Sequence, residues 1–164
     1  YGGGNVSPMI LERLSREPYR LTMRRGSARI GTVPDAVQVG PKVCLINKYS
    51  ASDGDLFPWG FRALGLGKLI GTRTWGGIVG ISGSLPYMDG TDIRVPFFTS
   101  FDPKTGSWII ENHGVDPDIL IDNDPVKEWN GEDQQLDRAI QEVMKELQDR
   151  KPLPGVPTPR DFSK

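Results

Sequence analysis

The most regular hydrophobic pattern lies near the C-terminal end of the chain. Between residues 134 and 150, apolar side chains recur at helical spacing opposite charged positions; they are Leu136, Ile140, Val143, Met144 and Leu147. An apolar stripe with this period predicts an amphipathic helix. A shorter helix is predicted after Gly2-Gly3-Gly4, with Ser7 as its N-cap and Pro8 as its first helical residue.

A strand, a helix and a second strand are predicted in the middle of the chain. Residues 42–47 form an apolar run typical of a strand buried on both faces, and residues 68–73 form a second such run. Between them, apolar residues at helical spacing predict a helix that is capped by Asp55 and ends at Gly65. Strand, helix and strand in this order predict a βαβ unit with parallel strands.

The remaining segments have weaker patterns. Residues 18–41 are basic and glycine-rich, which indicates a loop with short irregular strand. Short strands are predicted around residues 81–85, 93–98 and 108–111, separated by turns. Prolines punctuate residues 151–164, so we expect a domain over 1–150 followed by an extended tail. The fold class that these elements predict is α/β.

Composition narrows the range of functions. The chain has 20 basic and 21 acidic residues, with no like-charged block that would indicate nucleic-acid binding. Its apolar runs are too short for a membrane span, and no spacing typical of metal ligands occurs. Cys44 lies in an apolar run, which predicts an inert buried thiol. These features fit a cytoplasmic protein that needs no cofactor, although export by a separate segment stays open.

Ser52 is the strongest candidate for chemistry. It lies in the polar turn between the first predicted strand and the helix, followed by Asp53-Gly54. A serine in a sharp strand-to-helix turn has an exposed hydroxyl, and backbone N–H groups at the helix start can face an oxyanion. The alternative is that Ser52 and its polar neighbours only cap the helix. Local sequence alone favours capping.

Three longer motifs change this balance because they occur together and in order. They are YSASDGDLF at residues 49–57, LGLGKLIGTRTWGG at residues 64–77 and ENHGVDPD at residues 111–118. Together with the opening glycines, they resemble the catalytic core of tricorn proteases, relatives of the C-terminal processing (tail-specific) peptidases. The similarity covers roughly residues 2–150.

The resemblance implies a fold and a set of roles. The fold would be a crotonase-like or ClpP-like core, and the reaction would be peptide hydrolysis through an acyl-enzyme. Ser52 would be the nucleophile, and the backbone N–H of Asp53, with that of Gly3 or Gly4, would form the oxyanion hole. Glu111 would act through a second serine to orient the catalytic histidine. The resemblance also implies a homo-oligomer.

The base that would activate Ser52 is not evident. Related processing peptidases use a lysine at the position that Gly77 occupies here, so a histidine mechanism is favoured. His113 is the single histidine and lies two residues from Glu111, but tricorn sequences do not require a histidine there. We therefore expect the histidine and the second serine in an upstream part of the same protein or on another chain. The 164 residues alone should show little or no activity.

Two other functions remain open at this point. A crotonase-like homologue without catalysis would bind a peptide or an apolar ligand, or serve as a scaffold in an assembly. A third possibility is acyl-CoA chemistry on the same fold, although no motif requires CoA. Arg20-Leu21-Thr22-Met23 precedes Arg24-Arg25-Gly26, where related enzymes can carry an acidic residue, so a preference for basic substrate side chains is in doubt.

Overall fold

A small parallel sheet forms the centre of the molecule. The computed structural model describes residues 2–81, 85–159 and 161. Strand β3 (Val43–Ile46) pairs in parallel with β4 (Lys68–Gly71), and β4 pairs in parallel with β9 (Ile119–Leu120), giving the order β3-β4-β9. Helix α2 (Asp53–Ala63) connects β3 to β4. The predicted βαβ unit is therefore confirmed.

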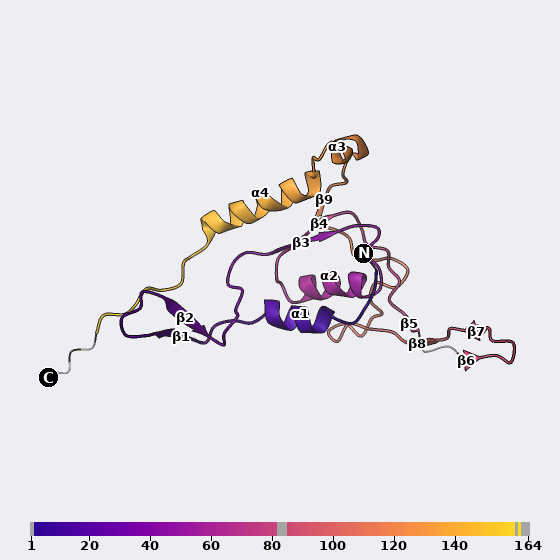
Figure 1. Ribbon diagram of the computed structural model, residues 1–164, viewed down its shortest axis with the longest axis horizontal. Helices are drawn as coiled ribbons and strands as arrows, with labels where there is room; N and C mark the ends of the chain where they lie inside the picture. Colours follow the sequence, from indigo (N-terminus) through magenta and orange to yellow (C-terminus); the bar gives the residue numbers. More distant parts are fainter. Residues whose placement is uncertain (1, 82–84, 160, 162–164) are drawn as a thin grey trace.

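Helices cover the sheet on both faces. Helix α4 (Gln134–Asp149) packs against β3 and β4, while α2 packs against the same two strands and against α1 (Ser7–Leu14). Figure 1 shows α4 on one side of the strands and α2 and α1 on the other. A short helix, α3 (Pro125–Trp129), lies between β9 and α4 in the chain. The result is a layered mixed helix and strand structure, as the predicted α/β class requires.

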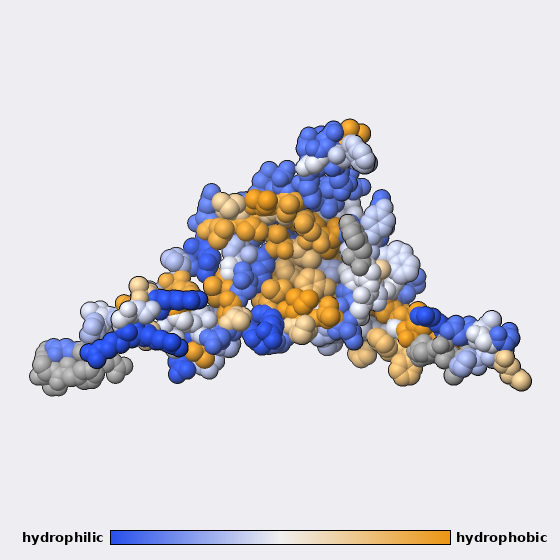
Figure 2. Space-filling view, in the orientation of Figure 1, coloured by the Kyte–Doolittle hydropathy of each residue, from blue (hydrophilic) through white to orange (hydrophobic). Residues whose placement is uncertain are grey.

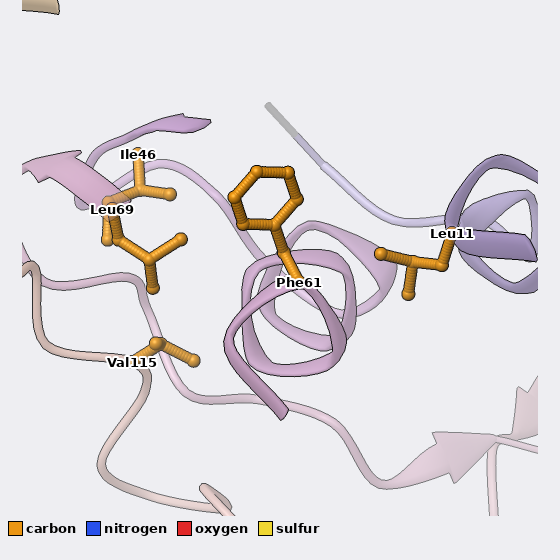
Figure 3. Packing of buried hydrophobic residues seen from close by; sticks show 5 residues of the cluster. All are labelled: Leu11, Ile46, Phe61, Leu69 and Val115. Atoms are coloured by element: carbon orange, nitrogen blue, oxygen red, sulfur yellow. The ribbon is translucent and has the colours of Figure 1, made fainter. Parts of the chain in front are cut away.

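The core lies between α1, α2 and the sheet. Its buried members are Leu11, Ile46, Phe61, Leu69 and Val115. In Figure 3, the ring of Phe61 projects from α2 into the space between Leu11 on one side and Ile46 and Leu69 on the other. Burial of one such side chain contributes about 1.5–3 kcal/mol. This core holds the start of α2 beside the end of β3, where Ser52 lies.

Two extensions project from the layered part in opposite directions (Figure 1). One is an antiparallel hairpin of β1 (Arg20–Met23) and β2 (Ile30–Val33). The other is formed by two antiparallel pairs, in which β5 (Gly80–Ile81) pairs with β8 (Pro96–Phe98) and β6 (Leu85–Pro86) pairs with β7 (Asp92–Ile93). Both extensions lie far from the central sheet in this view.

Several sequence-based predictions need correction here. Residues 18–41 contain a regular hairpin rather than an irregular strand, because four residue pairs of β1 and β2 are in register. Residues 108–111 form no strand; Trp108 makes an isolated bridge to Phe101, and a turn follows. Residues 82–84 of the segment predicted around 81–85 lie outside the described residues.

The helix starts differ from the predictions as well. Val6 is the N-cap of α1, and Ser7 is the first helical residue, because the Ser7 hydroxyl bonds Asp53 instead of its own helix. Helix α2 begins at Asp53, so Asp55 lies in its first turn and does not cap it. The predicted C-terminal helix is present, but Ile140 and Met144 of its apolar stripe are more than half exposed. None of the helices in the described residues combines the length and hydropathy that crossing a membrane requires.

Candidate active site

Ser52 occupies a sharp turn between β3 and α2. Its backbone has φ 56° and ψ −116°, a conformation that non-glycine residues rarely adopt. Such a residue costs about 1–3 kcal/mol and persists only where its surroundings fix it. Here the N–H of Ser52 donates to the carbonyl of Gly77 at 3.1 Å, and its own carbonyl accepts from Asp55 and Leu56. A strained turn between a strand and a helix is a geometry that can expose a nucleophilic serine.

The contacts of Ser52, Asp53 and Asp55 rule out the alternative that these side chains only cap α2. Ser52 makes no side-chain cap bond to α2. The Asp53 carboxylate instead accepts from the N–H groups of Val6 and Ser7 at 2.9 and 3.0 Å, at the start of α1. The Asp55 carboxylate bonds residues after β4. The polar side chains of the turn therefore connect separate segments of the chain.

The structure brings Gly3 against Ser52. A Cβ atom on Gly3 would lie 2.7 Å from the Cβ and 2.9 Å from the Oγ of Ser52, so only glycine fits without displacement. Gly4 lies beside the Asp53 side chain. Asp53 is the first residue of α2, and the first N–H groups of a helix have no partner within it. Residues predicted to supply oxyanion donors thus lie around the serine.

A buried carboxylate fixes the segment that holds the turn in place. Asp55 is fully buried and accepts from the N–H groups of Gly76 and Gly77 at 2.7 and 3.2 Å. Because the Gly77 carbonyl in turn accepts the N–H of Ser52, Asp55 acts on the serine through Gly77. Sequence reasoning missed this role. Its partners lie 21 and 22 residues away, and only an acidic residue predicted to be buried would have indicated it.

Glu111 binds the next two residues of the same segment. Its Oε2 atom accepts from the N–H groups of Ile78 and Val79 at 2.7 and 3.0 Å, and the residue is half-buried. Ser52 and Glu111 therefore contact one short stretch, residues 77–79, from two different parts of the chain. A carboxylate in this position can hold a backbone segment and present a negative charge beside it.

His113 is engaged elsewhere. Its side chain is 57% exposed, and Nε2 lies 2.8 Å from the Oδ2 of Asp116. The neighbouring backbone is held by Thr74, whose hydroxyl accepts from the N–H of Val115 at 2.7 Å. His113 thus pairs with a carboxylate at the surface, which is a common structural role for a histidine.

Cys44 offers no nucleophile. Its side chain is partly buried, and burial raises the pKa of the thiol to about 12. The reactive thiolate form is therefore rare at neutral pH. Within the described residues, no group of three or more His, Cys, Asp or Glu side chains is placed to hold a metal ion. The candidate chemistry rests on Ser52 and backbone donors.

Comparisons with known proteins identify the family. The model of peptidase family S41 matches residues 2–121, and the chain belongs to this family. It is 43% identical to the tricorn protease of Thermoplasma volcanium over 150 residues, or 90% of this chain and 14% of that protein. It is 39% identical to tricorn protease homolog 1 of Streptomyces coelicolor over 138 residues, or 84% of this chain and 13% of that protein.

A solved structure agrees with the sequence comparisons. The crystal structure of a tricorn protease superimposes with a TM-score of 0.81 and 40% identity, covering 90% of this chain and 14% of the other. The resemblance to tricorn proteases, predicted from three motifs, is therefore confirmed. The chain spans only 13–14% of the length of these relatives.

Proposed function

We propose that the chain is the nucleophile-bearing part of a serine peptidase that hydrolyses peptides through an acyl-enzyme. The observation that carries this proposal is the strained backbone of Ser52, pinned to Gly77 at the point where β3 meets α2. A serine that only capped the helix would not need this conformation. Membership of peptidase family S41 supports the choice of a peptide as substrate.

The proposed reaction follows from the geometry around Ser52. Its Oγ attacks the carbonyl carbon of a peptide bond while a histidine takes the hydroxyl proton. The negative charge that develops on the carbonyl oxygen is stabilised by the N–H of Asp53 and by that of Gly3 or Gly4. The histidine then protonates the leaving amine, and a water molecule activated by the same histidine hydrolyses the acyl ester.

The histidine and a second serine would come from the upstream remainder of the protein. His113 is paired with Asp116, and Glu111 would orient the external histidine through the second serine. We therefore propose that the isolated 164 residues have little or no peptidase activity. A crotonase-like or ClpP-like core, an amphipathic α4, a homo-oligomeric assembly and a cytoplasmic location belong to the same proposal.

Labelling with a fluorophosphonate tests the proposal. The complete protein and the 164-residue chain are each treated as wild type and as Ser52→Ala, and the labelled peptide is mapped by mass spectrometry. We expect labelling at Ser52 in the complete wild-type protein and at least a ~10³-fold slower reaction in the isolated chain.

Two results would contradict the proposal. Failure of the well-folded complete protein to label, beside a serine hydrolase that does label, would favour a non-catalytic binding or scaffold homologue. Peptide turnover by the isolated chain that is lost in Ser52→Ala would show that no upstream base is needed.

A further inference from the structure

The side chain of Asp53 has no role in the proposed reaction, which uses only its backbone N–H. It is nevertheless buried, and both of its oxygens accept hydrogen bonds. Oδ2 accepts from the N–H groups of Val6 and Ser7 at 2.9 and 3.0 Å, and Oδ1 accepts from the Ser7 hydroxyl. Asp53 is the first residue of α2 and Ser7 is the first residue of α1, so one carboxylate joins the starts of two helices.

Helix α1 obtains its N-terminal cap from this contact. Its own N-cap residue, Val6, makes no side-chain cap bond. The first N–H groups of a helix need an acceptor from outside the helix, and a negative charge there is also favoured by the helix dipole. Asp53 supplies both to Ser7 from a position 46 residues away in the sequence.

The contact between Asp53 and Ser7 lies in apolar surroundings. Both residues are buried, and a cavity of about 330 Å³ beside them is lined by Ile10, Leu45 and Phe57 among others. Figure 2 shows hydrophobic residues over the middle of the molecule, where Figure 1 places α1, α2 and β3. A hydrogen bond to a charged group is stronger in such surroundings than in water, and its donor is costly to leave unpaired. The Asp53 carboxylate therefore holds the start of α1 firmly.

The glycines that precede α1 lie between two anchors, and the partners of these anchors flank Ser52 in the sequence. At one end Gly2 forms a bridge with Ser50, and at the other end Val6 bonds Asp53. Three residues separate the two anchors. A free glycine backbone samples many conformations, so a short segment held at both ends is far more ordered than a free one.

Three N–H groups around the serine are left without an acceptor. Within the part of the chain that the structure describes, nothing accepts from the N–H of Gly3, Gly4 or Asp53. A Cβ atom on Gly3 would lie 2.7 Å from the Cβ of Ser52, and one on Gly4 would lie 3.8 Å from the Oδ2 of Asp53. Unpaired donors beside a nucleophile suit the stabilisation of a developing oxyanion.

We propose that the Asp53 carboxylate is a positioning residue that fixes the two halves of the oxyanion hole relative to each other. One half is the N–H of Asp53 itself. The other half is the N–H of Gly3 or Gly4, in a segment that continues into the anchored Val6. This inference rests on the proposed function, because it assigns a further role within the same site.

The rest of α1 does not depend on this carboxylate. Leu11 of α1 is buried in the core and lies against Gly60 of α2, so the two helices also have an apolar contact. Loss of the Asp53 carboxylate should therefore release the start of α1 and the glycines before it, while the remainder of the helix stays packed.

Fluorophosphonate labelling of the complete protein tests the inference, because the phosphonyl oxygen of the reagent takes the place of the oxyanion. Asp53→Ala should lower the labelling rate at saturating reagent about 10–100-fold, with the half-saturating concentration unchanged. The side chain of Asp53→Asn can still accept from the N–H groups of Val6 and Ser7, so this variant should recover most of the rate. Both variants lack the charge, so the difference between them measures the effect of the anchor.

Two further variants separate positioning from stability. Ser7→Ala removes the hydroxyl bond and keeps both backbone bonds, so it should fold and label at a rate between those of the wild type and Asp53→Ala. Asp133→Ala removes a similar contact at the start of α4, where the carboxylate accepts from the N–H of Leu136 at 3.0 Å. It should lower the Tm and leave the labelling rate unchanged.

Hydrogen exchange of residues 2–7 measures the anchor directly in the complete protein. We expect exchange in this segment to be at least about tenfold faster in Asp53→Ala than in the wild type, and unchanged in Asp133→Ala.

Several results would overturn the inference. They are labelling of Asp53→Ala at the wild-type rate, unchanged exchange of residues 2–7, or equal losses in Asp53→Ala and Asp53→Asn, which would assign the effect to the charge. If Asp53→Ala does not fold, wild-type labelling and wild-type exchange in Ser7→Ala would overturn it equally. Failure of the complete wild-type protein to label would contradict the proposed function, whereas a labelled wild type with an unaffected Asp53→Ala would contradict this inference alone.

Discussion

Strand β3 and the turn that follows it are adjacent in sequence and are held in different ways. The turn at Ser52 is fixed by polar contacts within the chain, from Gly77 to its N–H and from Asp55 to Gly77. The outer edge of β3 is apolar and open, and Leu45 there is 42% exposed. The turn that carries Ser52, the proposed nucleophile, is therefore fixed by polar contacts within the chain, while the strand before it has an exposed apolar edge.

Removing the buried carboxylate should have the largest effect on stability. Asp55→Ala leaves the N–H groups of Gly76 and Gly77 without their acceptor in a buried site, at a cost of about 2–5 kcal/mol in the free energy of unfolding. Leu45→Ala on the open edge should cost less than about 1 kcal/mol. Urea unfolding of both variants measures the contrast. Equal losses would show that the turn and the strand are stabilised alike.

A smaller effect on stability is expected at Glu111. Two substitutions separate its role in holding the backbone of Ile78 and Val79 from its proposed role in orienting the external histidine. The Gln oxygen of Glu111→Gln can still accept from Ile78 and Val79, so the free energy of unfolding should fall by less than about 1 kcal/mol, against about 1–3 kcal/mol for Glu111→Ala. If the charge orients the external histidine, fluorophosphonate labelling of the complete Glu111→Gln protein should slow about 10–100-fold.

Wild-type labelling rates in Glu111→Gln would assign the residue a structural role alone. Loss of the fold in that variant would instead show that the amide cannot replace the carboxylate. Thermal unfolding of Glu111→Gln beside the wild type distinguishes the two outcomes before labelling is attempted.

The smallest effect on stability is expected for the ion pair between Glu142 of α4 and Lys68 of β4. The hydrogen bond from Lys68 lowers the pKa of buried Glu142 below its ordinary 4.5, and the same bond raises the pKa of Lys68 above 10.5. A carboxyl group with a lowered pKa contributes stability above its unfolded pKa and loses it as pH falls through the folded pKa. The lysine contributes below its unfolded pKa and loses the contribution as pH rises through its folded value.

Thermal unfolding of wild type and Glu142→Gln measures this contribution. The wild type should be the more stable protein at neutral pH, and the difference in Tm should shrink as the pH falls below the ordinary pKa of 4.5, because the pKa of Glu142 is lowered in the folded protein. Glu132→Gln, an exposed residue before α4, serves as control and should show no such change. A difference in Tm that stays constant as the carboxyl group is protonated at acid pH would contradict the proposed role of the charge.

Short-range patterns in the sequence predict those elements that depend on residues close together in the chain. The βαβ unit and the turn at Ser52 follow from apolar runs and helical spacing within about 30 residues. The sequence predicts Ser7 and Asp55 as helix caps, because a single sequence shows only near neighbours. Their actual partners lie across the fold, with Asp53 and Ser7 separated by 46 residues.

The exposed face of β3 shows a second limit. Residues 42–47 carry the apolar pattern of a strand buried on both sides, and the prediction was wrong for the chain as described because Leu45 is exposed. The pattern reflects the surroundings in which a segment is buried, and those surroundings can include another segment.

The positive φ of Ser52 sets stability against chemistry at a single position. Glycine adopts φ 56° without the steric cost that a side chain incurs, so Ser52→Gly would relieve strain of order 1 kcal/mol. Selection for a durable fold alone would favour glycine there. A serine at this position lowers the stability of the fold, and it supplies a hydroxyl group, which glycine lacks.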